Sequence, residues 1–137
     1  YPSFDQLGGD CTNFISQCLY AGSGIWNETP DTGWYLRSLN DRAAAWSGVE
    51  YLAKFLLRDG GPGPYAKRCS WQDLKPGDVV QLGNHERFYH SLLVVQTGKT
   101  FGDVLIATHT FDTLNRRLDS YVFHRLRCLT IVGVRTG

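Results

Sequence analysis

The first clear hydrophobic pattern in the chain begins at Cys11 and runs to about Ala21. Apolar side chains recur there at steps of three and four residues, which is the spacing of one face of an α-helix; they are Cys11, Phe14, Ile15, Cys18 and Leu19. Gly22 follows as a typical helix stop. The pattern predicts a helix over residues 11–21, with Cys11 in its first turn at the margin of the hydrophobic core.

A second helix is predicted by Ser47-Gly48-Val49-Glu50, which has the capping-box pattern. In that motif Ser47 is the N-cap, and the Glu50 side chain reaches back to it. Apolar residues then follow at helical spacing, namely Val49, Leu52, Ala53, Leu56 and Leu57. The glycine- and proline-rich run 60–64 cannot continue a helix, so we expect the helix to end before it.

Residues 22–46 separate the two predicted helices and are rich in Gly, Asn, Asp, Thr and Trp. We expect a long irregular segment here, of the kind that is usually functional or packed by its own side chains. Its aromatic residues could anchor it in the core or line a groove, and we favour anchoring; they are Trp26, Trp34, Tyr35 and Trp46.

After Trp71 the hydrophobic period becomes that of β-strands. Predicted strands cover 79–82, 88–95, 104–110 and 128–134, with a short piece at 121–125 and a hairpin around Gly98 and Gly102. Helices first and strands afterwards indicate an α+β fold, with N-terminal helices packed on a C-terminal antiparallel sheet. No repeat or linker interrupts this order, so we expect one domain over residues 1–137.

The composition is that of an ordinary globular domain, with 42% hydrophobic and 20% charged residues. A net charge of +1 gives no electrostatic reason to expect a nucleic acid or an anionic membrane as partner. No apolar run reaches the length of about 18 residues that a membrane-spanning helix needs, so we expect no membrane insertion. The sequence leaves the oligomeric state open.

Cys11 is the best candidate for a catalytic group, because Gly8-Gly9-Asp10 precedes it and a predicted helix follows it. A thiol is a poor nucleophile until it loses its proton, and the partial positive charge at a helix N-terminus favours the thiolate. His90 stands near the start of the second predicted strand. Rigid backbone could hold it there opposite Cys11, as the acid and base of a catalytic dyad.

A third group commonly fixes the orientation of a catalytic imidazole. His109, at the end of the next predicted strand, is our first choice, because neighbouring strands align side chains across a sheet. Asp112 is the alternative. We expect the oxyanion to bind the backbone amide of Cys11 and one more donor, for which Gln6 and Asn13 are weak candidates.

No metal or other cofactor is predicted. His85 and His90 stand five residues apart, whereas the zinc-protease motif needs two histidines four apart on a helix. The four cysteines include no C-x-x-C pair, which argues against zinc ribbons and thioredoxin-like redox sites. We expect Cys18, Cys69 and Cys128 to be buried thiols, with a disulfide between Cys69 and Cys128 as the main exception.

These residues resemble the putative amidase domain family, a branch of the papain-like NlpC-type and CHAP cell-wall hydrolases. The longest and most specific matching segment is 8–19, Gly-Gly-Asp-Cys-Thr-Asn-Phe-Ile-Ser-Gln-Cys-Leu. Shorter matching segments cover 32–35, 46–52, 77–82, 89–92 and 108–110 with Asp112. Members usually carry a helix before the Gly-Gly-Asp-Cys segment, whereas only nine residues precede Asp10 here, so the domain could be truncated at its N-terminus.

The resemblance implies a papain-like α+β fold, with Cys11 at the start of the central helix, His90 on the packed sheet and His109 as the polar third residue. It also implies a bacterial protein, secreted or associated with the cell envelope, that cleaves an amide bond in peptidoglycan or a related peptide. Two other interpretations keep the same fold. One is an acyltransferase that uses the same dyad, and the other is an inactive domain that binds peptide or glycan through the aromatic segment 26–46.

Overall fold

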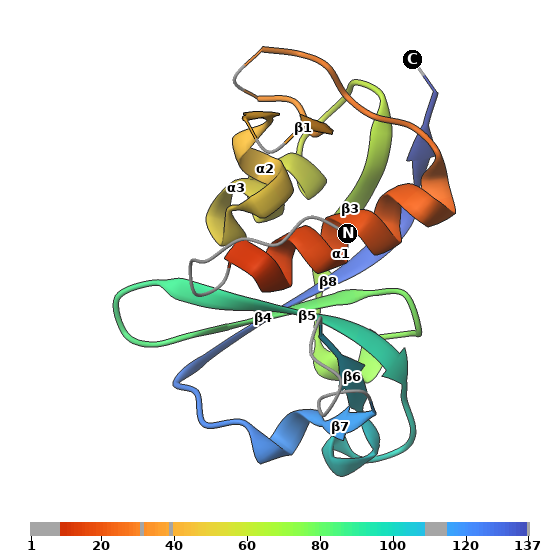
Figure 1. Ribbon diagram of the computed structural model, residues 1–137. Coiled ribbons are helices and arrows are strands. Elements are labelled where there is room, and N and C mark those ends of the chain that lie inside the picture. The colour runs from red at the N-terminus through yellow and green to blue at the C-terminus, as the bar shows by residue number, and fades with distance from the viewer. Residues whose placement is uncertain (1–8, 31, 39, 109–114, 137) are drawn as a thin grey trace.

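Three helices pack on one side of an antiparallel sheet in the computed structural model, which describes residues 9–30, 32–38, 40–108 and 115–136 (Figure 1). The helices are α1 (Gly9–Ser23), α2 (Ala44–Ser47) and α3 (Val49–Leu56). The six strands follow the spatial order β3 (Gly63–Cys69), β8 (Arg125–Arg135), β4 (Val79–Gly83), β5 (Phe88–Gln96), β6 (Leu105–Ala107) and β7 (Arg116–Arg117). Each neighbouring pair is antiparallel, so the predicted α+β class is confirmed.

The sheet has two different faces. The helix face is the one that α1, α2 and α3 cover, and its hydrophobic cluster joins Ile15, Leu52 and Leu56 to Val79 and Leu129 of the sheet. The second face is covered by the segment between β7 and β8, which includes the short 3₁₀ helix η4 (Leu118–Ser120) and lies below the sheet in Figure 1. Its cluster consists of Leu74, Val80, Leu82, Leu92, Val94, Val104, Ile106, Leu118 and Cys128.

Helix α1 confirms the first predicted element and extends it by two residues at each end. Ile15 and Leu19 are buried on the side that faces the sheet. Gly24 follows the helix with a φ of +69°, a conformation that glycine adopts without a steric penalty. The helix runs along the helix face from the side of the β4–β5 hairpin towards the opposite end of the sheet (Figure 1).

The second predicted helix forms as α3, but its predicted N-cap is wrong. Ser47 is the last residue of the one-turn helix α2, and the N-cap of α3 is Gly48, which makes no side-chain cap hydrogen bond. The Ser47 hydroxyl instead accepts a hydrogen bond from Arg42 Nε at 3.1 Å. The backbone N–H of Gly48 donates to Ala44 O, so the short helix α2 uses the position that the capping box would have occupied.

The segment expected to be irregular contains α2 and a short hairpin of β1 (Leu36–Ser38) and β2 (Asp41–Arg42). Its expected anchoring in the core is confirmed for Trp34 and Trp46, which are 0% and 1% exposed. Their ring centroids lie 4.8 Å apart. Because these two rings are buried, they offer no surface to a ligand.

Predicted strands 79–82 and 88–95 are confirmed as β4 and β5, and 128–134 lies inside the longer β8. Strand β3 was not predicted, because the glycines and prolines before it obscure its alternation. The prediction of a short strand at 121–125 is wrong, since only Arg125 belongs to a strand. The strand expected over 104–110 corresponds to β6, which is shorter and follows the 3₁₀ helix η2 (Phe101–Asp103). Positions 109 and 110 of the prediction lie outside the described residues. A further 3₁₀ helix, η1 (Trp71–Asp73), connects β3 to β4.

Candidate active site

Cys11 is the third residue of α1 and is half-buried. Its position in the first turn puts it among the backbone amides that have no partner within the helix, where the helix dipole favours a negative charge. Surroundings of this kind favour the thiolate form of a cysteine. The sequence-based placement of Cys11 at the helix start is therefore confirmed.

Helix α1 buries three polar side chains, Thr12, Asn13 and Ser16, each 0% exposed. Ser16 Oγ accepts a hydrogen bond from Trp34 Nε1 at 2.9 Å and donates to Trp46 O at 2.8 Å. Trp46 Nε1 in turn donates to Asn13 Oδ1 at 2.9 Å. Asn13 thus anchors the aromatic segment in the core. Its complete burial argues against its expected role as an oxyanion donor; Gln6 lies outside the described residues.

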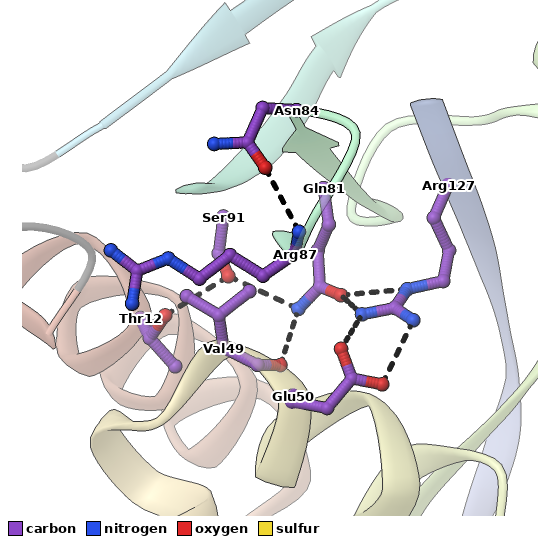
Figure 2. Close-up of polar contacts among 8 residues, drawn as sticks. All are labelled: Thr12, Val49, Glu50, Gln81, Asn84, Arg87, Ser91 and Arg127. Carbon is purple, nitrogen blue, oxygen red and sulfur yellow. Dashed lines mark hydrogen bonds and ion pairs between the residues drawn. The ribbon is translucent and has the colours of Figure 1, made fainter. Parts of the chain in front are cut away.

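Thr12, the remaining buried polar side chain of α1, connects the helix to strand β5. Thr12 Oγ1 and Ser91 Oγ are 3.0 Å apart and hydrogen-bonded (Figure 2). Ser91 Oγ also accepts a hydrogen bond from Gln81 Nε2 at 3.1 Å. The second hydrogen of Gln81 Nε2 goes to the carbonyl of Val49 at 2.9 Å. Since Ser91 accepts from Gln81, its own proton is available for Thr12, the residue that follows Cys11.

The orientation of the Gln81 amide is fixed from its other end. Gln81 Oε1 accepts from Arg127 Nε at 2.9 Å and from Nη2 at 2.5 Å. Arg127 is 7% exposed and forms two further hydrogen bonds to the Glu50 carboxylate, at 3.2 and 3.0 Å (Figure 2). These hydrogen bonds hold the pKa of Glu50 below its ordinary value. A hydrogen-bonded chain therefore runs from Glu50 and Arg127 through Gln81 and Ser91 to the first turn of α1.

Strand β5 has one more residue than β4 at the hairpin end of the pair. Leu82 pairs with His90, but the next residue, Gly83, pairs with Phe88, which leaves Tyr89 as the extra residue of a β-bulge. A bulge changes which side chains point to each face. This irregularity lies immediately before the histidine that was expected to serve Cys11.

The His90 side chain lies on the second face of the sheet. The Ser91 side chain points to α1, and alternation along the strand turns His90 the other way. The His90 ring accordingly packs against Tyr121 on the second face, with the ring centroids 5.8 Å apart. The structure therefore brings the backbone of His90 next to α1 but turns its ring away from the face on which Cys11 lies.

Burial lowers the pKa of His90 below its ordinary value, and the positive charge of Arg116 lowers it further. The buried Nδ1 atom has no hydrogen-bond partner among the described residues. A lowered pKa favours the neutral imidazole, which is the form that a general base requires.

The expected third residue, His109, and its alternative, Asp112, both lie outside the described residues. Ala107, the last residue of β6, pairs with Leu93 of β5, a residue that packs on the helix face. His109 stands two residues after Ala107 in the sequence.

Gln81, Ser91 and Arg127 were not singled out from the sequence. A signal was present for Gln81, which is a polar residue in the middle of the apolar run Val79-Val80-Gln81-Leu82. A buried polar residue on a central strand requires partners, and these come from β5, β8 and α3. Nothing in the sequence identified Ser91 or Arg127 as those partners.

A separate hollow of about 560 Å³ lies between α3 and the loop before β1, and none of its lining residues belongs to α1. Exposed Tyr51 and Lys54 contribute to its wall.

Among the described residues, no group of three or more His, Cys, Asp or Glu side chains could hold a metal ion. No described helix is long and apolar enough to span a membrane.

Comparison with known proteins agrees with the resemblance noted in the sequence. Residues 1–130 match the family described as a putative amidase domain, which indicates amide hydrolysis as the general activity. The chain is 32% identical over 121 residues to the uncharacterized protein YhbB of Bacillus subtilis (strain 168). That alignment covers 84% of this chain but only 38% of YhbB, so the chain spans well under half of that relative. No solved structure matches the chain.

Proposed function

Since this chain belongs to the putative amidase domain family, we propose that it is a cysteine amidase that hydrolyses an amide bond with Cys11 as the nucleophile. The proposed substrate is peptidoglycan or a related peptide, which would place the protein outside the bacterial cell or at its envelope. A papain-like arrangement of the NlpC and CHAP type, with the nucleophile at a helix start beside a sheet, is part of the proposal.

One observation carries the assignment of Cys11. Its neighbour Thr12 is held on Ser91 by a buried hydrogen bond, so the first turn of α1 is fixed against the strand that bears His90. A nucleophile must be held within a few tenths of an ångström of its productive position, and rigid secondary structure with supporting hydrogen bonds provides this. The half-buried Cys11 combines that fixed position with access to a substrate.

In the proposed reaction the Cys11 thiolate attacks the carbonyl carbon of the amide, and the backbone amides at the helix start stabilise the oxyanion. A histidine then passes its proton to the amine nitrogen as the C–N bond breaks, which leaves a thioester on Cys11. Water loses a proton to the same histidine and attacks the thioester, and the thiolate leaves. The net reaction consumes one water and releases a carboxylic acid and an amine.

Two histidines are proposed for this reaction, His90 to move the protons and His109 to orient His90. His90 can move the proton only if its side chain leaves Tyr121 and turns to the helix face. His109 lies outside the described residues, and the sequence gives it the orienting role. If His90 keeps the position described above, proton transfer falls to His109 instead.

The rate of iodoacetamide labelling of Cys11 against pH tests the proposal, with each site located by peptide mass spectrometry. We expect Cys11 to react fastest of the four cysteines at a pH well below 8, which is near the ordinary pKa of a thiol. His90→Ala and His109→Ala are compared, and the variant whose profile moves to that of an ordinary thiol identifies the proton acceptor. Cys18→Ser, on the same helix, is the matched control and should leave the profile unchanged.

If Cys11 labels no faster than an ordinary thiol, or if neither histidine variant changes its profile, the activated dyad is excluded. The activity itself is tested by release of new amino groups from peptidoglycan and from stem peptides, with Cys11→Ser as the inactive variant. Addition of an amine acceptor separates hydrolysis from acyl transfer, because a transferase would form a new amide with it.

The inactive binding domain is a second candidate, and the hollow beside α3 is the observation that favours it. Tyr51 and Lys54 could contact a peptide or glycan there, whereas Trp34 and Trp46 are buried. Binding that is lost in Tyr51→Ala and retained in Cys11→Ser, without any amine release by the unmodified chain, would support this alternative.

A further inference from the structure

Cys69 and Cys128 stand directly opposite each other in the antiparallel pair of β3 and β8. Directly opposed residues of such a pair project to the same face of the sheet, with Cβ atoms about 4.5–5.5 Å apart. Both side chains accordingly belong to the second face, where Cys128 is a buried member of the hydrophobic cluster and Cys69 packs at its border. A disulfide needs Cβ atoms about 3.5–4.5 Å apart, so a small approach of the two strands is enough to join the sulfurs.

We propose that Cys69 and Cys128 form a site of oxidative modification, at which they join in a disulfide that ties β3 to β8. All four cysteines are thiols in the structure. The other two, Cys11 and Cys18, both lie on α1, on the opposite side of the sheet. Oxidation at this site therefore leaves the proposed nucleophile available, and the inference does not rest on the proposed function.

The oxidant is a low-molecular-weight disulfide such as glutathione disulfide. The more exposed Cys69 attacks first, as a thiolate, and forms a mixed disulfide while one glutathione thiolate leaves and takes up a proton. Cys128 then attacks the Cys69 sulfur and releases the second glutathione. Two protein thiols are oxidised, one disulfide oxidant is reduced to two thiols, and the protein loses two hydrogens.

The surroundings of the two thiols make this reaction slow at neutral pH. Burial raises the pKa of Cys69, and the negative charges of Asp78 and Asp73 raise it further. Burial, followed by the neighbouring Cys69 and by Asp78, raises the pKa of Cys128 to about 12. Because the thiolate is the attacking species, the rate of disulfide formation rises with pH.

The consequence for the fold follows from the position of β3, which is an edge strand of the sheet. Residue 69 is its last residue, and the bond to β8 would prevent this end of the edge from separating. A disulfide that closes a loop of about 60 residues stabilises the folded state mainly by restricting the unfolded chain. The oxidised protein should therefore melt roughly 5–10 °C above the reduced protein.

The test is incubation of the full chain with glutathione disulfide at about pH 9, followed by digestion and mass spectrometry. We expect one peptide pair linked through Cys69 and Cys128, a protein mass lower by about 2 Da once any glutathione held on Cys11 is subtracted, and the rise in melting temperature. Cys128→Ser should stop at a mixed disulfide on Cys69, and Cys69→Ser should show neither the bridge nor the temperature shift. Cys18→Ser is the matched control and should behave like the unmodified chain.

Persistence of both thiols after this treatment would overturn the inference, and so would a bridge between any other pair. A bridge that forms without a change in melting temperature would overturn its structural role. None of these outcomes depends on amidase activity, which is measured separately with Cys11→Ser.

Discussion

The helix face and the second face of the sheet are built from the same strands but differ in what they bury. On the helix face, Gln81, Ser91 and Arg127 lie in one hydrogen-bonded chain that ends on Thr12. On the second face, the same strands contribute mostly aliphatic side chains. Buried polar groups require partners in fixed directions, whereas aliphatic packing tolerates small shifts. The helix face is therefore the one that can hold a reactive group in a defined position.

The polar side chains of α1 have a structural role of their own. Thr12, Asn13 and Ser16 are fully buried, and each bonds to a different part of the molecule. Together they fix the rotation of α1 about its axis. Since Cys11 shares that helix, its position relative to the sheet is fixed as well.

The largest effect on stability is expected on the second face, for Leu92→Ala. Leu92 is 0% exposed in the apolar cluster, and removal of a buried leucine side chain costs about 2–5 kcal/mol of unfolding free energy. Urea denaturation measures it. The iodoacetamide profile of Cys11 should not change, because the Leu92 side chain faces away from α1.

Val122→Ala is the control for that prediction, since Val122 is 88% exposed beside the same face and its truncation should cost close to nothing. A change in Cys11 reactivity in Leu92→Ala, at temperatures where the variant is folded, would show that the two faces are not independent.

An intermediate effect is expected on the helix face, for Gln81→Leu. The substitution keeps the size of the side chain but leaves Arg127, the carbonyl of Val49 and Ser91 each without one partner. We expect a loss of about 2 kcal/mol in unfolding free energy, because buried polar groups lose their hydrogen bonds. Unlike Leu92→Ala, it should also alter the pH profile of Cys11 labelling, because Ser91, which holds Thr12, loses the hydrogen bond from Gln81 that orients it.

The exposed Gln96, at the far end of β5, gives the matched control Gln96→Leu, which should leave both measurements unchanged. If Gln81→Leu lowers stability but leaves the Cys11 profile as it was, the hydrogen-bonded chain supports the fold alone and does not position the nucleophile.

The sequence predicted the elements that have a regular period, and it placed Cys11 correctly at a helix start. It could not predict features that depend on residues distant in the sequence. Which of Ser91 and His90 faces α1 depends on the pairing of β5 with β4, in which Ser91 stands opposite Gln81 and His90 opposite Leu82. The partners of Gln81 come from three separate elements, none of which is marked by local spacing. The capping box at Ser47 failed for a related reason, since α2 took up that position.

The smallest effect concerns the titration of His90. Because burial lowers its pKa in the folded protein, the unfolded chain binds this proton at a higher pH than the folded chain. The unfolding free energy should therefore fall as the pH drops below about 6.5, the ordinary histidine pKa, and continue to fall through the lower pKa of the folded state. His90→Asn should remove this part of the pH dependence, whereas His85→Asn, at an exposed position, should not.

The sign of that effect distinguishes the two faces as locations for His90. An imidazolium paired with the Cys11 thiolate would have a raised pKa, because an opposite charge favours the protonated form. The stability contribution of such a pair would be present at low pH and would be lost as the pH rises through the raised pKa, which is the reverse slope. An NMR titration of His90 in the unmodified chain and in Cys11→Ser measures this directly. A pKa below the ordinary value in both proteins keeps His90 on the second face, whereas a raised pKa that falls in Cys11→Ser shows that its side chain turns to the helix face and serves the nucleophile.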